Sequence, residues 1–184
     1  MKTMDELTRT LGEITEKGCQ GVCYDFAINA SLFWQQKSLH KINDFKKLQD
    51  FSKWSEFGGC KEWSDEFAKS FEESDVLVIV RPDYADKQMY VQTHFMVALG
   101  GSWFAGINNN FEQGTPSSAE EIEGEIMMIS FSGAPVYADS RDGKAVPHRR
   151  NRFVRIQKTS VEDFVKDFCK SIAPVEKSSC CNVQ

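Results

Sequence analysis

The sequence predicts an α+β fold in which N-terminal helices pack on a C-terminal antiparallel sheet. Two observations carry this prediction. Apolar residues recur every three to four positions in the first half, whereas β-branched and apolar runs separated by turn residues dominate the second half. The 184 residues, of which 41% are hydrophobic, suffice for one domain with a real core. We expect that domain to span residues 1–172, with a flexible polar tail at 173–184.

The helices are expected first along the chain. Residues 4–17 place Leu7, Leu11 and Ile14 at helical spacing, and residues 23–39 are apolar enough for a central buried helix. Three more segments are expected to be helical, namely residues 44–54, 61–73 and 160–172. The last of these begins at Ser160, a residue type that caps helices, and has acidic residues in its first turn.

The strands are expected to follow. Residues 75–80 form a short β-branched run, and residues 90–99 and 102–107 read as a hairpin that turns at Gly100-Gly101. Alternation within the second hairpin strand places Trp103, Ala105 and Ile107 on one face and Phe104 on the other. Two further strands are expected, at residues 125–131 and 152–157.

Charge and composition exclude several classes of protein. A net charge of −5 gives no support to nucleic-acid binding, and the short basic run at residues 148–152 is typical of a solvated loop. The chain shows no apolar run of about 18 residues and no secretory signal at its start, so we expect a cytoplasmic protein whose six cysteines are reduced. Cys19 and Cys23 lie four residues apart, but no second Cys/His pair has matching spacing, so we expect no metal and no cofactor.

A cysteine and a histidine lie at the start of an apolar helix and an apolar strand. Cys23 begins the predicted central helix, and 71 residues later His94 begins an apolar strand. A helix N-terminus favours a thiolate, and a neighbouring histidine can take the thiol proton and return it to a leaving group. Asn108 and Asn109 follow the next strand, and an amide there can fix the orientation of the imidazole. The pattern indicates a thiol hydrolase with catalytic Cys23 and His94, and it does not separate Asn108 from Asn109 as the third member.

These motifs resemble those of the papain-like cysteine hydrolase superfamily. Gly21-Val22-Cys23-Tyr24-Asp25-Phe26 is similar to the family's Gly-x-Cys-aromatic-x-Phe pattern, and His94-Phe95-Met96-Val97-Ala98-Leu99-Gly100 is similar to its histidine strand. By layout the chain resembles compact bacterial effectors, the YopT/AvrPphB-type cysteine proteases and glutamine-deamidase toxins. Transglutaminase-like proteins share the motif Gly-Val-Cys-x-Asp-Phe-Ala around Cys23. The resemblance covers residues 21–111 and implies a papain-like catalytic domain at residues 1–172.

The chain departs from that pattern at the oxyanion donor. Papain-like proteases carry a glutamine six residues before the cysteine, where this chain has Lys17, and Gln20 is the nearest substitute. The backbone N–H of Cys23 would be the second donor. Cys19 is the rival nucleophile, and it precedes Gln20 in the loop that approaches the helix.

The last four residues, Cys181-Asn182-Val183-Gln184, partly fit a prenylation signal. A final Gln favours farnesyl transfer to Cys181, and acylation of the adjacent Cys180 would supply a second membrane anchor. The expected partners are therefore a protein substrate, a farnesyl transferase and a membrane. With the resemblance to effectors, this predicts action in a eukaryotic host cytoplasm.

Taken together, the sequence predicts a thiol-dependent amide hydrolase, either a protease or a protein glutamine deamidase, acting on a protein substrate. Both reactions pass through the same thioester, so the sequence does not choose between them. The alternatives are a transglutaminase-like acyl transferase and a non-catalytic papain-like module that binds a partner at a membrane.

Overall fold

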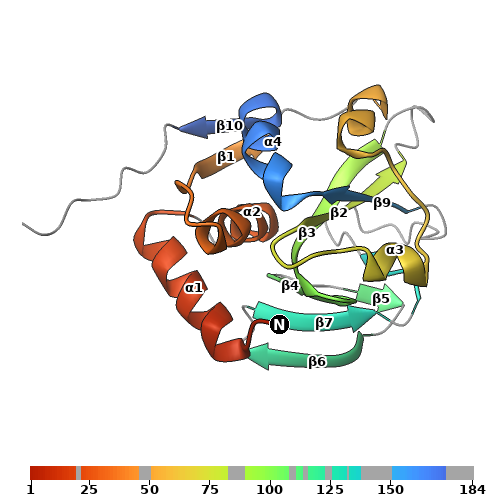
Figure 1. The fold of residues 1–184 in the computed structure, drawn as a ribbon, viewed down its shortest axis with the longest axis horizontal. Helices are drawn as coiled ribbons and strands as arrows, with labels where there is room; N and C mark the ends of the chain where they lie inside the picture. Colours follow the sequence, from red (N-terminus) through yellow and green to blue (C-terminus); the bar gives the residue numbers. More distant parts are fainter. Residues whose placement is uncertain are drawn as a thin grey trace, which may run out of the picture.

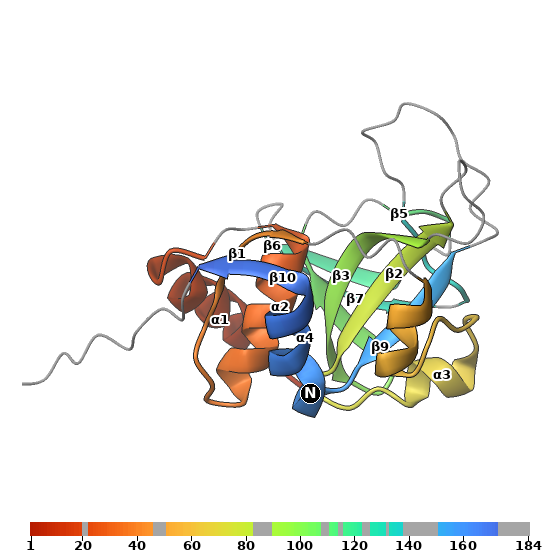
Figure 2. The same ribbon diagram turned by 90° about the horizontal axis from the view of Figure 1, so that it is seen from above.

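The computed structural model describes residues 1–19, 22–45, 51–82, 90–107, 111–113, 116–122, 126–131, 133–137 and 151–172. In this part of the chain, helices and an antiparallel sheet form the predicted α+β arrangement, with helices first and most of the sheet after them. Helices α1 (Met4–Glu16), α2 (Cys23–Trp34) and α4 (Val161–Phe168) lie on one side of the sheet, and the short α3 (Asp65–Lys69) lies on the other (Figures 1 and 2).

The N-terminal helices form for different reasons. Helix α1 begins with a capping box, in which the Glu6 N–H donates to Thr3 Oγ1 at 3.3 Å and the Thr3 N–H donates to the Glu6 carboxylate at 2.9 Å. Its apolar positions Leu7 and Ile14 are buried on one side, as the periodicity predicts. Helix α2 has no side-chain cap and is held by packing, because almost every residue from Asp25 to Leu32 is buried.

The main sheet has six strands among the described residues, in the order β6-β7-β4-β3-β2-β9, and every neighbouring pair is antiparallel. Its strands are β2 (Val76–Pro82), β3 (Tyr90–Gly100), β4 (Trp103–Gly106), β6 (Pro116–Ile122), β7 (Ile126–Phe131) and β9 (Arg152–Ile156). Strands β3 and β4 form the predicted hairpin. Its turn uses Gly100 and Gly101 at φ of 100° and 63°, a region that suits glycine. Two small sheets pair β1 (Lys41–Phe45) with β10 (Cys169–Ile172) and β5 (Phe111–Gln113) with β8 (Val136–Tyr137).

The sheet has two buried faces. We call the one under α2 the α2 face; it carries Val76, Val78, Val80, Phe95, Val97, Leu99 and Ala105. The other, which we call the α3 face, carries Leu77, Ile79, Met96, Ala98, Phe104, Ile129 and Phe153. The Trp63 ring covers the α3 face, with its centroid 5.0 Å from that of Phe153. The faces alternate residue by residue, as the pleat requires and as the sequence predicts for Trp103 to Ile107.

Four helix predictions are wrong in whole or in part. The helix expected at residues 23–39 ends at Trp34. Of the helix expected at residues 44–54, residues 44–45 belong to β1 and residues 51–54 to a 3-10 helix, η1 (Phe51–Phe57), while residues 46–50 lie outside the described residues. Within residues 61–73 only α3 is helical, because Ser64 caps it and Ser70 ends it. The last helix stops at Phe168, where the chain becomes β10 and pairs with β1. Ser160 is its N-cap residue but makes no side-chain capping bond. At β1 and β10, strand pairing overrides a local amphipathic pattern.

The helices of the described residues are all too short or too polar to cross a membrane.

Candidate functional site

Cys23 is the first residue of α2. Its N-cap residue, Val22, is extended, with φ of −106° and ψ of 155°, and the Cys23 side chain is half-buried. The rest of the helix is buried in the core, so its N-terminus is fixed in place. The sequence prediction of a cysteine at the start of a central buried helix is therefore confirmed.

Burial raises the pKa values of the other described cysteines. Burial raises the pKa of Cys19 to about 11, with a further contribution from the nearby Asp25 carboxylate. Burial also raises the pKa of Cys60 to about 11 and that of Cys169 to about 12. These three thiols remain protonated at neutral pH. Cys23 is therefore a better candidate for the reactive cysteine than its rival Cys19.

His94 lies in β3 and is fully buried. It is opposite Ile79 of β2, next to an irregularity in the pairing: Ile79 faces His94, whereas Val80 faces Gln92. Strand β3 therefore holds one extra residue, Thr93, immediately before the histidine. Such bulges are common next to active sites, where they redirect a side chain.

Helix α2 packs on strand β3, and the start of the helix meets the middle of the strand. The ring of Tyr24, next to Cys23, meets the ring of Phe95, next to His94, edge to face at a centroid distance of 6.3 Å. Further along, the Ser31 hydroxyl of α2 donates to the Ser74 carbonyl at 2.6 Å, close to the far end of β3. The structure thus brings the helix start that carries Cys23 to the part of β3 that carries His94.

Strand alternation, however, separates the two side chains. Phe95 lies on the α2 face with Val97, whereas the register opposite Ile79 assigns His94 to the α3 face with Met96. The expected pairing of a Cys23 thiolate with the His94 imidazole therefore needs the histidine to change faces. The bulge before His94 is where the strand can make this change.

Five residues of the predicted site lie outside the described residues, namely Gln20, Asn108, Asn109, Cys180 and Cys181. The oxyanion role of Gln20, the orienting role of Asn108 or Asn109 and the lipidation of Cys180 and Cys181 stay predictions. The expected membrane partner and cytoplasmic location stay predictions with them.

The structure adds a buried polar group beneath the N-terminal half of α2. Asn29 Nδ2 donates to Asp25 Oδ1 at 2.8 Å and to the His40 carbonyl at 2.9 Å, and the His40 N–H donates back to Asn29 Oδ1 at 2.9 Å. Asp25 and Asn29 are fully buried. Two polar residues four apart in an apolar helix are the signal that could have found this group. It fixes the chain at His40 against the helix that begins with Cys23.

The same group predicts a pH dependence. Burial lowers the pKa of His40 from its usual range. Around and below about pH 6.5 the unfolded chain therefore binds more protons at this residue than the folded protein, so stability decreases as pH falls. We expect the free energy of unfolding of His40→Gln, measured by urea titration, to decrease less than that of wild type between about pH 7 and about pH 5. Parallel pH profiles would contradict this assignment.

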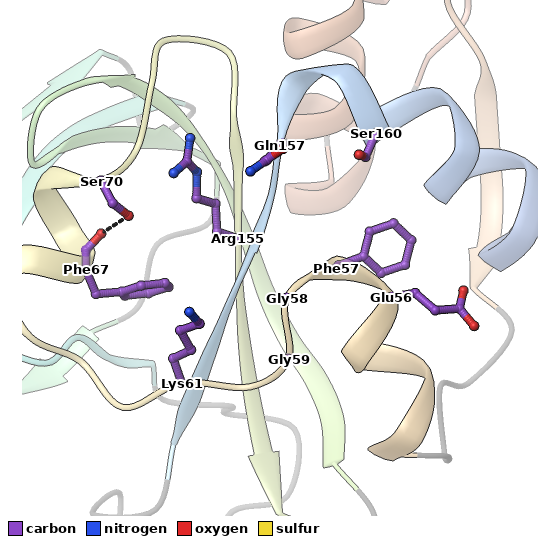
Figure 3. A pocket seen from close by; sticks show the side chains of 10 residues that line it. All are labelled: Glu56, Phe57, Gly58, Gly59, Lys61, Phe67, Ser70, Arg155, Gln157 and Ser160. Atoms are coloured by element: carbon purple, nitrogen blue, oxygen red, sulfur yellow. Dashed lines mark hydrogen bonds between the residues drawn. The ribbon is translucent and has the colours of Figure 1, made fainter.

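A separate cavity of about 360 Å³ lies between β9, α3 and the loop after η1. Lys61, Phe67 and Arg155 lie together on one side of it, whereas the Glu56 side chain extends away from them (Figure 3). Arg155 already donates through Nε to the buried Asp75 carboxylate at 2.6 Å. Neither Cys23 nor His94 lines this cavity.

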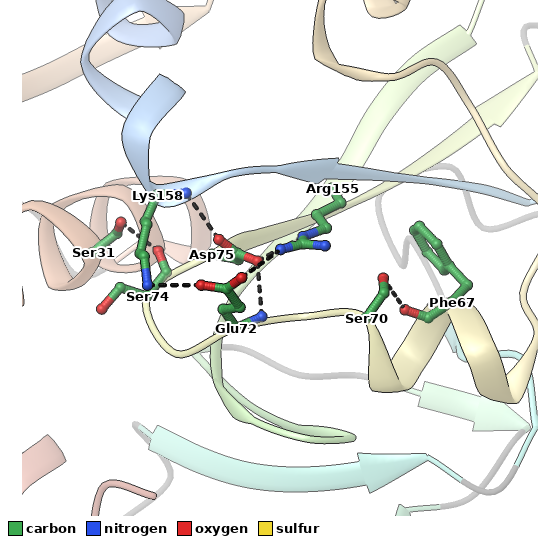
Figure 4. Close-up of polar contacts among 8 residues, drawn as sticks. All are labelled: Ser31, Phe67, Ser70, Glu72, Ser74, Asp75, Arg155 and Lys158. Atoms are coloured by element: carbon green, nitrogen blue, oxygen red, sulfur yellow. Dashed lines mark hydrogen bonds and ion pairs between the residues drawn. The ribbon is translucent and has the colours of Figure 1, made fainter.

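Asp75 forms a buried polar junction between β2, β9 and the loop before β2 (Figure 4). Besides Arg155, its carboxylate accepts from the N–H groups of Lys158 at 2.8 Å and Glu72 at 2.9 Å. Glu72 is exposed and pairs with the Lys158 ammonium at 2.9 Å. We interpret this junction as structural, because the buried Asp75 carboxylate accepts from three donors of the protein itself.

No cluster of three or more metal-ligating side chains occurs in the part of the chain that the structure describes. Comparison of the chain with protein families, with curated proteins and with solved structures finds no match. The site is therefore interpreted from its own geometry.

Proposed function

We propose that the protein is a thiol-dependent amide hydrolase with Cys23 as its nucleophile and His94 as its general base. The observation that carries the proposal is the position of Cys23, at the first residue of a buried helix whose start packs against the part of β3 that carries His94. A helix N-terminus stabilises the thiolate. The raised pKa values of Cys19, Cys60 and Cys169 leave Cys23 as the best candidate among the described cysteines.

The proposed reaction has two steps. The Cys23 thiolate attacks the amide carbonyl, the C–N bond breaks, and His94 gives the thiol proton to the leaving amine or ammonia. Water, deprotonated by His94, then hydrolyses the thioester and regenerates the thiol. The Cys23 N–H and Gln20 would bind the oxyanion, and Asn108 or Asn109 would orient the imidazole. Proton transfer requires His94 to turn toward α2 at the bulge before it.

We propose that the substrate is a protein and that the reaction is peptide-bond cleavage or glutamine deamidation, within a papain-like fold. The described α+β architecture is compatible with such a fold, because the cysteine helix packs on an antiparallel sheet that includes the histidine strand. A transglutaminase-like acyl transfer would use the same thioester, with an amine in place of water.

A second candidate function is favoured by one observation. The register of β3 assigns His94 to the α3 face, where a fully buried histidine is a core residue and not the general base for Cys23. In that case the protein is a non-catalytic papain-like module that binds a partner. The two candidates differ in whether His94 affects the reactivity of the Cys23 thiol.

The experiment that tests the proposed reaction compares wild type with Cys23→Ala in a eukaryotic cell lysate. Mass spectrometry of the lysate proteins should show changes that only wild type produces. A gain of about one mass unit at a glutamine indicates deamidation, and new chain termini indicate proteolysis. Identical peptide masses with both proteins would contradict the hydrolase proposal and favour the binding module.

A further inference from the structure

A second cavity, of about 510 Å³, lies between α1 and the C-terminal end of α2. These two helices lie side by side at one end of the molecule (Figures 1 and 2). Four cationic side chains and two aromatic rings line the cavity, namely Lys2, Arg9, Lys17, Lys37, Phe33 and Trp34. Neither Cys23 nor His94 is among them.

The cavity is basic in an acidic protein. The chain has a net charge of −5, yet no acidic side chain of the described residues lines this cavity. Lys2 pairs with Glu73 at 3.2 Å and Lys37 pairs with Glu162 at 2.9 Å, and both carboxylates lie outside the cavity lining. Cations gathered in a cleft repel one another and attract a multivalent anion.

Two of the cations remain available for such an anion. Within the described part of the chain, neither Arg9 nor Lys17 forms an ion pair. Arg9 lies in α1 and Lys17 is the C-cap residue of the same helix, eight positions later, which corresponds to about 12 Å along a helix axis. A single phosphate can contact only some of the four cationic side chains, whereas a chain of phosphates can contact more of them.

The aromatic rings hold the cations in place. The Lys2 ammonium lies 5.2 Å from the Trp34 ring centroid, and the Lys17 ammonium lies 5.6 Å from that of Phe33. Trp34 is itself fixed, because its indole N–H donates to Thr10 Oγ1 at 3.1 Å. Side chains that are already held in place lose less conformational entropy when a ligand binds, which strengthens binding.

The chain reversal after α2 forms the remaining wall. The Gln36 N–H donates to the Phe33 carbonyl and the Lys37 N–H to the Leu32 carbonyl, each at 2.9 Å, and Gln36 has a φ of 57°. This is the Schellman arrangement that ends many helices. It ties the backbone at Lys37 to α2, so the fourth cation does not lie on a free loop.

We propose that this cavity binds a small soluble ligand that carries two or more phosphate groups. Its volume lies within the usual range of small-molecule sites, and a guanidinium together with ammonium groups is the usual protein environment for phosphates. The same chemistry occurs in free polyphosphates and in phosphoinositide headgroups, and the experiment below separates these two sources.

The test is isothermal titration calorimetry at low ionic strength with tripolyphosphate and, separately, with inorganic phosphate. Wild type should bind tripolyphosphate at one site and more tightly than phosphate, and added salt should weaken the binding. The double variant Arg9→Gln/Lys17→Gln should bind tripolyphosphate about tenfold more weakly. Both residues are exposed, so we expect this variant to fold. The matched control, Lys69→Gln/Lys166→Gln, removes two exposed cations elsewhere and should bind like wild type.

Vesicle flotation separates the two sources of phosphate. Wild type is mixed with phosphatidylcholine vesicles that contain a phosphatidylinositol bisphosphate, with and without competing tripolyphosphate. Saturable binding of tripolyphosphate that weakens only in the Arg9/Lys17 variant supports the soluble ligand. Binding to the vesicles without binding of free tripolyphosphate would overturn it in favour of a lipid surface. No saturable binding by wild type, or equal affinities in the two double variants, would overturn the site itself.

Discussion

Asp75→Ala should lower the free energy of unfolding by about 3 kcal/mol. The wild-type carboxylate is 1% exposed and accepts hydrogen bonds from the Arg155 guanidinium and from two backbone N–H groups. Alanine leaves these three donors without their acceptor, and Arg155 loses its shortest ion pair. Urea unfolding followed by circular dichroism measures the loss directly.

The matched control is Glu72→Ala. Glu72 belongs to the same cluster and pairs with Lys158 at 2.9 Å, but its side chain is 64% exposed. Exposed ion pairs contribute little, so this variant should lose less than about 1 kcal/mol. Equal losses in the two variants would mean that the buried carboxylate is not what joins β2 to β9.

Cys23→Ala should reduce the hydrolysis rate at least about a thousandfold, because no other group in the proposed mechanism can form the thioester. The side chain is small and half-buried, so the free energy of unfolding should change by less than about 1 kcal/mol. The rate is measured on the protein that the lysate comparison identifies, and stability is measured by urea unfolding of the same preparation.

Cys19→Ala is the control for this prediction. Cys19 lies in the same region of the chain, but burial raises its pKa to about 11, and its thiol donates to the His40 carbonyl at 3.7 Å. This variant should keep most of the activity and lose some stability. An inactive Cys19 variant beside an active Cys23 variant would show that the nucleophile was assigned to the wrong cysteine.

Much of the fold could be predicted from local pattern. Helix α1, the start of α2, the β3–β4 hairpin and strand β9 lie within one or two residues of their predicted bounds. Each has a clear apolar period or a decisive turn residue, such as the glycines at 100 and 101. Strand β10 could not be predicted, because only its pairing with β1, more than a hundred residues away, extends the chain after Phe168.

The candidate site could also be predicted only in part from local sequence pattern. The place of Cys23 follows from local signals, since the apolar run begins there. The side-chain direction of His94 does not, because it depends on the register of β3 against β2 and on the extra residue at Thr93. The group formed by Asp25, Asn29 and His40 also requires knowing which loop crosses α2.

The most direct test of the proposed hydrolase is the rate at which iodoacetamide alkylates Cys23 as a function of pH, measured by peptide mass spectrometry. It is compared in wild type and His94→Gln, with urea unfolding confirming that both are folded. We expect wild-type Cys23 to react at about pH 6, where ordinary thiols are slow, and His94→Gln to lose this reactivity. If Cys23 alkylation follows an ordinary thiol titration in both proteins, and His94→Gln changes stability alone, His94 is a core residue and the catalytic pair does not exist.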